Sequence, residues 1–310
     1  MLGDYVQTTI KSAVQFKGVG LHSGAPVRMT VHPASAEYGI WFRRTDLDFE
    51  PLIPARWDAV GEARLCTRID GPSGASVQTI EHIMAALAGC GIQNALIEID
   101  GPEVPVMDGS AALFVDALLA AGVRKLDAPV RAIRILKPVE YREGKAFARL
   151  EPCDTFMIDF HIEFEDAAIG RQEKVLNMAN GAFVRELCDS RTFCRQSDIE
   201  FMHANGLALG GSLENAVVVD GDRVLTPGGL RHEDEAVRHK MLDALGDLAL
   251  AGAPLLGRYV GHRAGHMMTN RLLRALFADP TAFEMITCDE RMARRLPGVG
   301  VHPADVPLHA

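Results

Sequence analysis

The sequence has few of the features that mark secreted, membrane-spanning or disulfide-stabilised proteins. Its six cysteines never form a CxxC pair, which argues against a disulfide framework and against a thiolate zinc site. No stretch contains 18 consecutive uncharged apolar residues, so the sequence predicts no transmembrane helix. The opening segment, MLGDYVQTTIKSAVQFKG, lacks the apolar run of a signal peptide. We therefore expect a soluble cytoplasmic protein with reduced thiols.

Positive charge is also scarce. The chain has 32 lysines and arginines against 41 aspartates and glutamates, for a net charge of −9. This balance disfavours nucleic-acid binding through a general basic surface. An anionic substrate would need a local basic patch. The remaining composition, 48% apolar and 24% charged over 310 residues, is typical of a globular protein with one large or two ordinary domains.

The order of predicted elements indicates two domains of similar topology. Short strands fill the first sixty residues, and a helix is predicted from about Ser76, closed by glycines. RKLDAP is predicted to be a linker, after which strands resume and a helix follows over 234–250. Because strands precede helices in each half, we expect α+β layers rather than a doubly wound parallel sheet. The predicted domains are 1–125 and 126–310, and about 188–222 is predicted as an insert with its own short helix and strand.

The helix predicted over 234–250 carries polar residues that an apolar periodicity does not require. Its apolar stripe occupies one side, while the opposite flank has a row at steps of four: His239, Asp243 and Asp247. Gly246, near that row, would let another backbone or a ligand come close. One interpretation is a solvated polar face with incidental pairs. The other is a metal site, because a His and an Asp one helical turn apart can both reach one ion.

A third ligand and a catalytic group are available in TIEHIMAALAG. His82 follows Glu81 there, near the start of a helix rich in small residues. Two histidines and one aspartate leave an open fourth position on zinc, which is the catalytic arrangement. A neighbouring carboxylate such as Glu81 could accept a proton from water. A histidine in such a helix can equally be a satisfied structural residue.

Two more histidines lie in GHRAGHMMTN. His262 and His266 are four residues apart, on a loop that enters a helix. If protonated, one of them could stabilise an oxyanion or protonate a leaving amine. The alternative is an ordinary polar loop with a helix cap.

Seven stretches, taken together, resemble one known family over nearly the whole chain. None is specific alone, but their order and approximate spacing are those of the zinc-dependent UDP-3-O-acyl-N-acetylglucosamine deacetylases of bacterial lipid A biosynthesis. The stretches are GVGLHSG, LCTRI, TIEHIMAALAGCGIQNALIEIDGPEVPVMDGSAALFV, SRTFCRQSDIE, GLALGGSLENAVVVD, LRHEDEAVRHKMLDALGDL and GHRAGHMMTN. The resemblance implies two α+β domains, each a β-sheet layered with α-helices and each with a small insert, whose helical layers pack face to face.

The resemblance also implies a metal centre and its base. His82, His239 and Asp243 are similar to the family's zinc ligands, and Glu81 to its general base. The cofactor implied is Zn²⁺, although ferrous iron also suits a His/His/Asp donor set. The metal would bridge the two domains, because its ligands come from both.

Three further matching residues have implied roles in catalysis. His266 is similar to a cationic histidine that stabilises the oxyanion and protonates the amine, with Asp247 orienting it. Thr192, in SRTF, is similar to a hydroxyl that hydrogen-bonds the tetrahedral intermediate.

The substrate implied by the resemblance is a UDP-sugar that carries one acyl chain. Lys240 and Arg263 match basic positions that meet the sugar nucleotide, and Phe160 is similar to a neighbour of the uracil. The segment 188–222 resembles an acyl passage, although simple packing of a strand pair would explain its small and apolar residues equally well. Arg195 stands at its mouth, where relatives often have an apolar residue. The substrate-contacting residues expected there are Phe193, Ile199, Ser212, Ala216 and Val218.

The sequence therefore predicts a metal-dependent amidohydrolase that removes the N-acetyl group from UDP-3-O-(3-hydroxyacyl)-N-acetylglucosamine, acting as a monomer. Three rivals remain. A nucleotide-sugar binding protein on the same scaffold would be expected to lose Glu81 or a ligand, and all are present. A different metallohydrolase would act on another acylated amine. A structural zinc protein would leave no room for a base and a cationic histidine.

Overall fold

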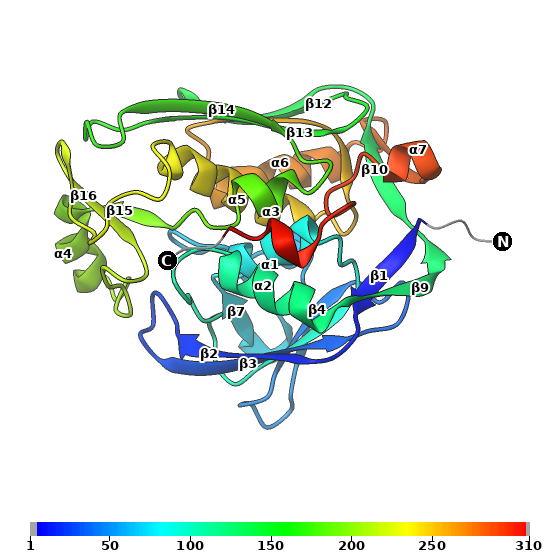
Figure 1. Ribbon diagram of the computed structural model, residues 1–310, viewed down its shortest axis with the longest axis horizontal. Helices are drawn as coiled ribbons and strands as arrows, with labels where there is room; N and C mark the ends of the chain where they lie inside the picture. The colour runs from blue at the N-terminus through cyan, green and yellow to red at the C-terminus, as the bar shows by residue number, and fades with distance from the viewer. Residues whose placement is uncertain (1–4, 308–310) are drawn as a thin grey trace.

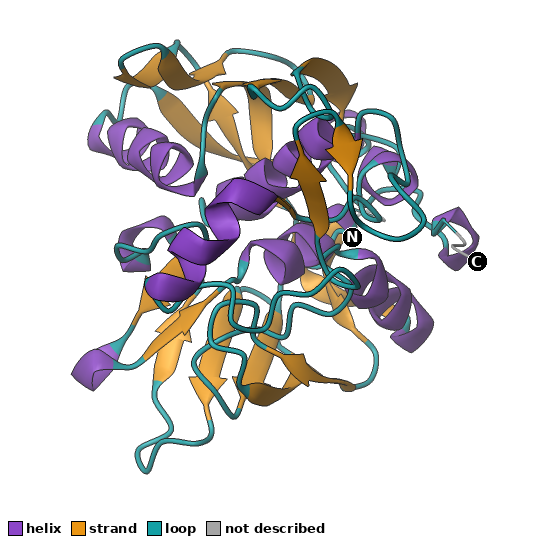
Figure 2. Cartoon of the chain, turned by 90° about the vertical axis from the view of Figure 1, so that its left-hand side faces the viewer, coloured by secondary structure: helices purple, strands orange, loops and turns teal. Residues whose placement is uncertain are grey.

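The protein is built from two sets of β-strands with helices between them. The computed structural model describes residues 5–307. Figure 1 shows most strands of the first half of the chain at the bottom and most of those of the second half at the top. Between them lie the helices α1 (Glu81–Gly89), α2 (Ala112–Ala121), α5 (Glu235–Ala249) and α6 (His266–Ala278). The perpendicular view shows the same layering (Figure 2). The α+β fold expected from the sequence is confirmed.

The first half forms one mixed five-stranded sheet and two pairs of short strands. The sheet has the order β2-β3-β8-β4-β5, and two smaller pairings join β1 to β9 and β6 to β7. The strands are β1 (Val6–Ile10), β2 (Val14–Val19), β3 (Pro26–Pro33), β4 (Ile40–Arg44), β5 (Leu52–Pro54), β6 (Arg68–Asp70), β7 (Ser76–Gln78), β8 (Ala95–Ile99) and β9 (Val123–Pro129). The helices are α1 (Glu81–Gly89) and α2 (Ala112–Ala121), with 3₁₀ turns η1 (Trp57–Ala59) and η2 (Pro72–Gly74).

The second half forms a larger sheet that branches at β18. Its main path is β11-β12-β18-β10-β19, and β13 pairs with both β18 and β14. The strands are β10 (Arg131–Ile135), β11 (Val139–Glu143), β12 (Ala146–Glu151), β13 (Phe156–Glu163), β14 (Arg171–Asn177), β18 (Leu255–His262) and β19 (Phe283–Thr287). The helices are α3 (Ala182–Glu186), α5 (Glu235–Ala249), α6 (His266–Ala278) and α7 (Glu290–Ala293), with the 3₁₀ turn η3 (Pro303–Asp305). No helix within residues 5–307 is long and apolar enough to cross a membrane.

The segment predicted as an insert is a small separate unit at one end of the molecule (Figure 1). It contains β15 (Phe193–Arg195), α4 (Gln196–Ala204) and β16 (Val217–Asp220), and β17 (Arg223–Val224) follows it directly. The three strands make a sheet of their own in the order β15-β16-β17. The predicted short helix and strand are therefore confirmed.

Helices α1 and α5 pack closely, and this contact corrects the solvated-face interpretation. Gly246 lies so near α1 that a Cβ atom added to it would come 2.0 Å from the backbone oxygen of Glu81. The close approach that its glycine suggested is thus made by another backbone. The polar row of α5 is buried as a result, with His239, Asp243 and Asp247 only 3–4% exposed.

Two other expectations about local structure are wrong. The helix predicted from Ser76 begins at Glu81, because residues 76–78 pair with β6 instead. RKLDAP is not a linker but part of β9, which pairs with β1 at the other end of the first half. The predicted boundary between residues 125 and 126 falls inside that strand, so the domain limits 1–125 and 126–310 stay a prediction. Their outermost residues, 1–4 and 308–310, lie outside the described residues.

Candidate metal centre and active site

Three residues expected as metal ligands meet between α1 and α5. His82 lies in the first turn of α1, and His239 and Asp243 lie one turn apart on α5. One ligand atom from each lies within 4.8 Å of the others. The Oδ1 atom of Asp243 is 3.3 Å from His239 Nε2 and 3.6 Å from His82 Nε2. Residues separated by more than 150 positions in sequence are therefore brought together by the packing of two helices.

The surroundings of His239 prepare one of its nitrogens for a metal. Its Nδ1–H donates to the backbone carbonyl of Ser190 over 3.0 Å, which leaves Nε2 as the free lone pair facing Asp243. Burial lowers the pKa of His239 to about 4, so the ring is neutral at neutral pH. A neutral imidazole with an oriented second nitrogen is the form that binds metal ions.

The donor set and one unpartnered oxygen fit a divalent metal ion. Two imidazoles and a carboxylate suit zinc and also ferrous iron. Asp243 Oδ1 is buried without a hydrogen-bond donor, which is costly for a carboxylate unless a cation faces it. Burial acts to raise the pKa of Asp243, but its basic neighbours His239 and Lys240 and the hydrogen bond from His82 outweigh it and hold that pKa well below its usual range. The carboxylate is therefore ionised and ready to bind.

Glu81 and Asp247 flank this cluster and share one hydrogen-bonding neighbour, Thr67. The Thr67 backbone N–H donates to Glu81 Oε2 over 3.0 Å, and its hydroxyl donates to Asp247 Oδ1 over 2.5 Å. Burial raises the pKa of Glu81. Thr67 stands in LCTRI, one of the stretches that carry the family resemblance, but no spacing in the sequence points to these two contacts.

His266 lies across from α1, as the first residue of α6. Its Nδ1 is 2.9 Å from Asp247 Oδ2, and its Nε2 is 3.9 Å from both Glu81 Oε1 and Asp243 Oδ2. Burial acts to lower the pKa of His266, but the carboxylates of Asp247 and Glu81 outweigh it and raise that pKa to about 9. The ring is thus a cation at neutral pH, with Nε2 pointing toward the cluster. His262, the last residue of β18, stacks on Phe147 instead.

Thr192 and Phe193 lie near the start of the insert. Thr192 is fixed through its backbone: its N–H donates to the Gly109 carbonyl and its own carbonyl accepts from the Val217 N–H, each over 2.8 Å. The Phe193 ring lies edge-on to His239, with centroids 6.3 Å apart. Phe193 therefore lies beside the metal-ligand cluster, whereas the contact of the Thr192 hydroxyl with the site stays a prediction.

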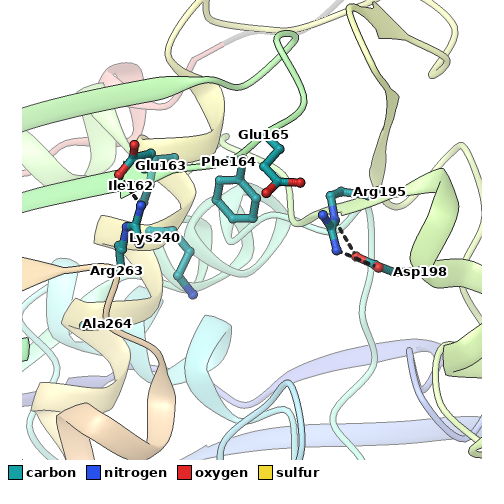
Figure 3. A pocket seen from close by; sticks show the side chains of 9 residues that line it. All are labelled: Ile162, Glu163, Phe164, Glu165, Arg195, Asp198, Lys240, Arg263 and Ala264. Carbon is teal, nitrogen blue, oxygen red and sulfur yellow. Dashed lines mark hydrogen bonds and ion pairs between the residues drawn. The ribbon is translucent and has the colours of Figure 1, made fainter. Parts of the chain in front are cut away.

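A pocket of about 480 Å³ opens next to the cluster, between β13, α5 and the insert. Figure 3 shows Lys240 and Arg263 on its wall, together with Phe164 and the bidentate pair of Arg195 and Asp198. Lys240 Nζ also lies 2.7 Å from Asp243 Oδ2, so it links the pocket to the candidate metal site. The same wall carries three acidic side chains, one of which, Glu163, pairs with Arg263, so the local basic patch expected for an anionic substrate stays a prediction.

The other predicted substrate contacts lie in different environments. Ala216 and Val218 are buried in and beside β16, Ile199 is half-buried on α4, and Ser212 is exposed. Phe160 is only 2% exposed and packs near Tyr259, with ring centroids 6.2 Å apart. It does not line the pocket. The acyl and uracil contacts of these five residues remain predictions.

Comparison with known proteins identifies the family. The model of the UDP-3-O-acyl N-acetylglycosamine deacetylase family matches residues 7–278. This chain belongs to that family. It is 46% identical to the UDP-3-O-acyl-N-acetylglucosamine deacetylase of Shewanella frigidimarina, covering 92% of this chain and 94% of the relative. The deacetylase of Pasteurella multocida is 44% identical, over 93% of this chain and 95% of its own length.

The family match runs through every part of the candidate site. The family match covers both helices that carry the candidate ligands, the insert and α6. The relative from Pseudoalteromonas atlantica, 46% identical, covers 91% of this chain and bears the same deacetylase name. The resemblance expected from the sequence is therefore confirmed at the level of the family.

Proposed function

We propose that this protein hydrolyses the N-acetyl group of UDP-3-O-(3-hydroxyacyl)-N-acetylglucosamine, releasing acetate, as the committed step of lipid A biosynthesis. Membership of the deacetylase family supports the reaction class and the substrate class. The observation that carries the proposal is the meeting of a His/His/Asp cluster with a buried carboxylate, Glu81, and a cationic histidine, His266. A binding protein would not need this combination of groups.

His82, His239 and Asp243 are proposed to hold one Zn²⁺, which Fe²⁺ could replace. When bound, such an ion acidifies water and polarises a carbonyl. The ligands would leave a coordination position open for chemistry, because three protein donors converge among the described residues. Lys240, whose Nζ contacts Asp243, would orient that carboxylate while its charge faces the pocket.

Glu81 and His266 are proposed to divide the proton transfers between them. Glu81, held by the Thr67 backbone, would accept the proton of the attacking water. His266, held by Asp247 with Nε2 toward the cluster, would stabilise the oxyanion and donate a proton to the leaving amine. The Thr192 hydroxyl would donate a further hydrogen bond to the oxyanion.

The pocket and the insert are proposed to hold the two ends of the substrate. Lys240 and Arg263 would meet the sugar nucleotide, whose negative charge they match. The acyl chain would enter the insert, where burying each CH₂ group contributes about 0.8 kcal/mol. We expect the protein to act as a cytoplasmic monomer on this small molecule, without nucleic acid.

The decisive experiment measures acetate release from UDP-3-O-(3-hydroxyacyl)-N-acetylglucosamine by purified protein. It is run before chelation, after chelation and after zinc is restored, with UDP-N-acetylglucosamine as the non-acylated control. We expect activity that disappears with chelation, returns with zinc and is weak on the control. Equal turnover of both substrates would point to a different metallohydrolase. Folded, metal-loaded protein that released no acetate would overturn the proposal in favour of a binding protein.

A further inference from the structure

A short segment at the start of the insert, residues 190–192, contains both the carbonyl that orients His239 and a proposed oxyanion donor. Ser190 accepts the hydrogen bond from His239 Nδ1, and Thr192 follows two residues later. The residue between them is Arg191, whose side chain is only 9% exposed. A displacement of the Arg191 backbone would therefore move the carbonyl that orients His239 and the hydroxyl of Thr192 together.

A buried carboxylate holds Arg191 in place, together with the Gly229 carbonyl, which accepts from Arg191 Nη2 over 2.8 Å. Glu235, 1% exposed, is the first residue of α5. Its Oε1 accepts from the Arg191 backbone N–H and from Arg191 Nε, each over 2.9 Å. Its Oε2 accepts from Arg191 Nη2 over 3.2 Å and from the Arg231 backbone N–H over 2.7 Å. All four bonds end on one ionised group, and bonds to ionised groups are stronger than neutral ones.

The same segment is fixed from its other side by the first half of the chain. Gly109 accepts from the Thr192 N–H, and the Ala111 N–H donates to the carbonyl of Cys188, each over 2.8 Å. The segment is thus held between a first-half loop and α5. On the α5 side, Glu235 precedes His239 by four residues. The same helix therefore carries the candidate ligand His239 and the carboxylate that holds the segment whose Ser190 carbonyl accepts from His239.

We propose that Glu235, acting through Arg191, is a positioning residue for the metal ligand His239 and for Thr192. The Thr192 part rests on the function proposed above, whereas the His239 part concerns metal binding alone. Groups that orient a ligand from outside the coordination sphere commonly change metal affinity by about 10–100-fold when they are removed.

The test compares Glu235→Gln with Asp234→Asn. Glutamine keeps one acceptor oxygen but places an NH₂ group against donors, so the four bonds cannot all form. Asp234 is the adjacent residue and pairs with Lys174 and Arg238 instead of the segment. It is therefore a matched control for losing a carboxylate at this end of α5.

Zinc affinity is measured by competition with a chromogenic zinc chelator, and circular dichroism checks the fold. We expect Glu235→Gln to bind zinc about 10–100-fold more weakly, while Asp234→Asn binds as the unmodified protein does. At saturating zinc, kcat for acetate release should stay reduced in Glu235→Gln with KM little changed, because Thr192 is displaced. Equal zinc affinity in the two folded variants would overturn the His239 part, and full recovery of kcat would overturn the Thr192 part.

A second variant covers the case in which Glu235→Gln fails to fold. Arg191→Lys keeps the charge and the backbone bond to Glu235 but loses the forked side-chain contact. We expect a smaller weakening of zinc binding than in Glu235→Gln, and an unchanged affinity would contradict the proposal. Zinc binding does not depend on the substrate. Wild-type protein that binds zinc but releases no acetate would therefore defeat the proposed function without deciding the role of Glu235.

Discussion

The α5 side and the α6 side of the site hold two histidines in opposite charge states. On α5, His239 faces the Ser190 carbonyl, and burial lowers its pKa to about 4. On α6, burial also acts to lower the pKa of His266, but the adjacent Asp247 carboxylate outweighs it and the pKa rises to about 9. On His239, burial outweighs the raising effects of Asp243 and of the Ser190 hydrogen bond and leaves a neutral ligand for metal. On His266, the carboxylates of Asp247 and Glu81 outweigh burial and produce a cation that can give up a proton.

The largest effect is expected from replacing the histidine with glutamine on the α5 side or on the α6 side. His239→Gln should lose both metal and turnover, because it removes a ligand. His266→Gln should keep its metal and lose turnover only. Metal content by atomic emission and acetate release check both variants. Metal loss from His266→Gln comparable to that from His239→Gln would break the comparison.

Glu81→Ala should reduce kcat by about 10²–10⁴-fold, the usual contribution of a general base, with metal still bound. Glu81 lies beside the ligand His82 in α1, but its oxygens face Thr67 and His266. Metal content and kcat are measured on the same preparation, with Glu81→Gln as the isosteric control. A Glu81→Ala protein without metal would make Glu81 a ligand and overturn its assignment.

Asp247→Asn should have a smaller effect, lowering kcat by about 10–100-fold, as expected for a residue that orients another. Asparagine can still accept from the Thr67 hydroxyl, but it removes the charge that raises the pKa of His266. That pKa should fall, which nuclear magnetic resonance of the His266 ring in the metal-free protein would measure. An unchanged titration would show that Asp247 does not set the charge state on the α6 side.

The smallest effect is expected from an exposed ion pair outside the site. Lys137 Nζ and Asp279 Oδ2 are 2.7 Å apart, close to the 2.9 Å between His266 Nδ1 and Asp247 Oδ2. Hydrogen bonds from Lys137 and Thr281 lower the pKa of Asp279 to about 2. Its stabilising contribution is therefore present above the unfolded pKa of about 3.9 and is lost as pH falls through about 2. Asp279→Asn should lower the melting temperature slightly at neutral pH, and less below pH 4. A large loss would contradict the rule that exposed pairs contribute little.

The polar row of α5 could be predicted from sequence, but its burial could not. Spacing of four places His239, Asp243 and Asp247 on one flank, and this was correct. Whether that flank meets water depends on α1, which comes from the other half of the chain. The only local signal of the contact was Gly246, whose missing side chain admits the Glu81 backbone.

The sequence did not predict the pairing of short strands or the backbone groups that hold the site residues. The strand at Ser76–Gln78 and the strand over RKLDAP form because β6 and β1 lie beside them, and strand propensity does not say which segments pair. Thr67 and Ser190 act partly through backbone atoms, which every residue has. Side-chain chemistry identifies ligands and bases, but it does not identify the peptide groups that hold them.

The contact at Gly246 fixes how closely the two halves of the chain approach each other at the candidate site. Even one methyl group at this position would clash with the Glu81 carbonyl and push the first turn of α1 away from α5. The residues on that turn, Glu81 and His82, would then draw away from Asp243. The distance between α1 and α5 at Gly246 therefore sets both the packing of the two halves and the spacing of the candidate metal ligands. Substitutions that separate the two helices should reduce metal binding as well as stability.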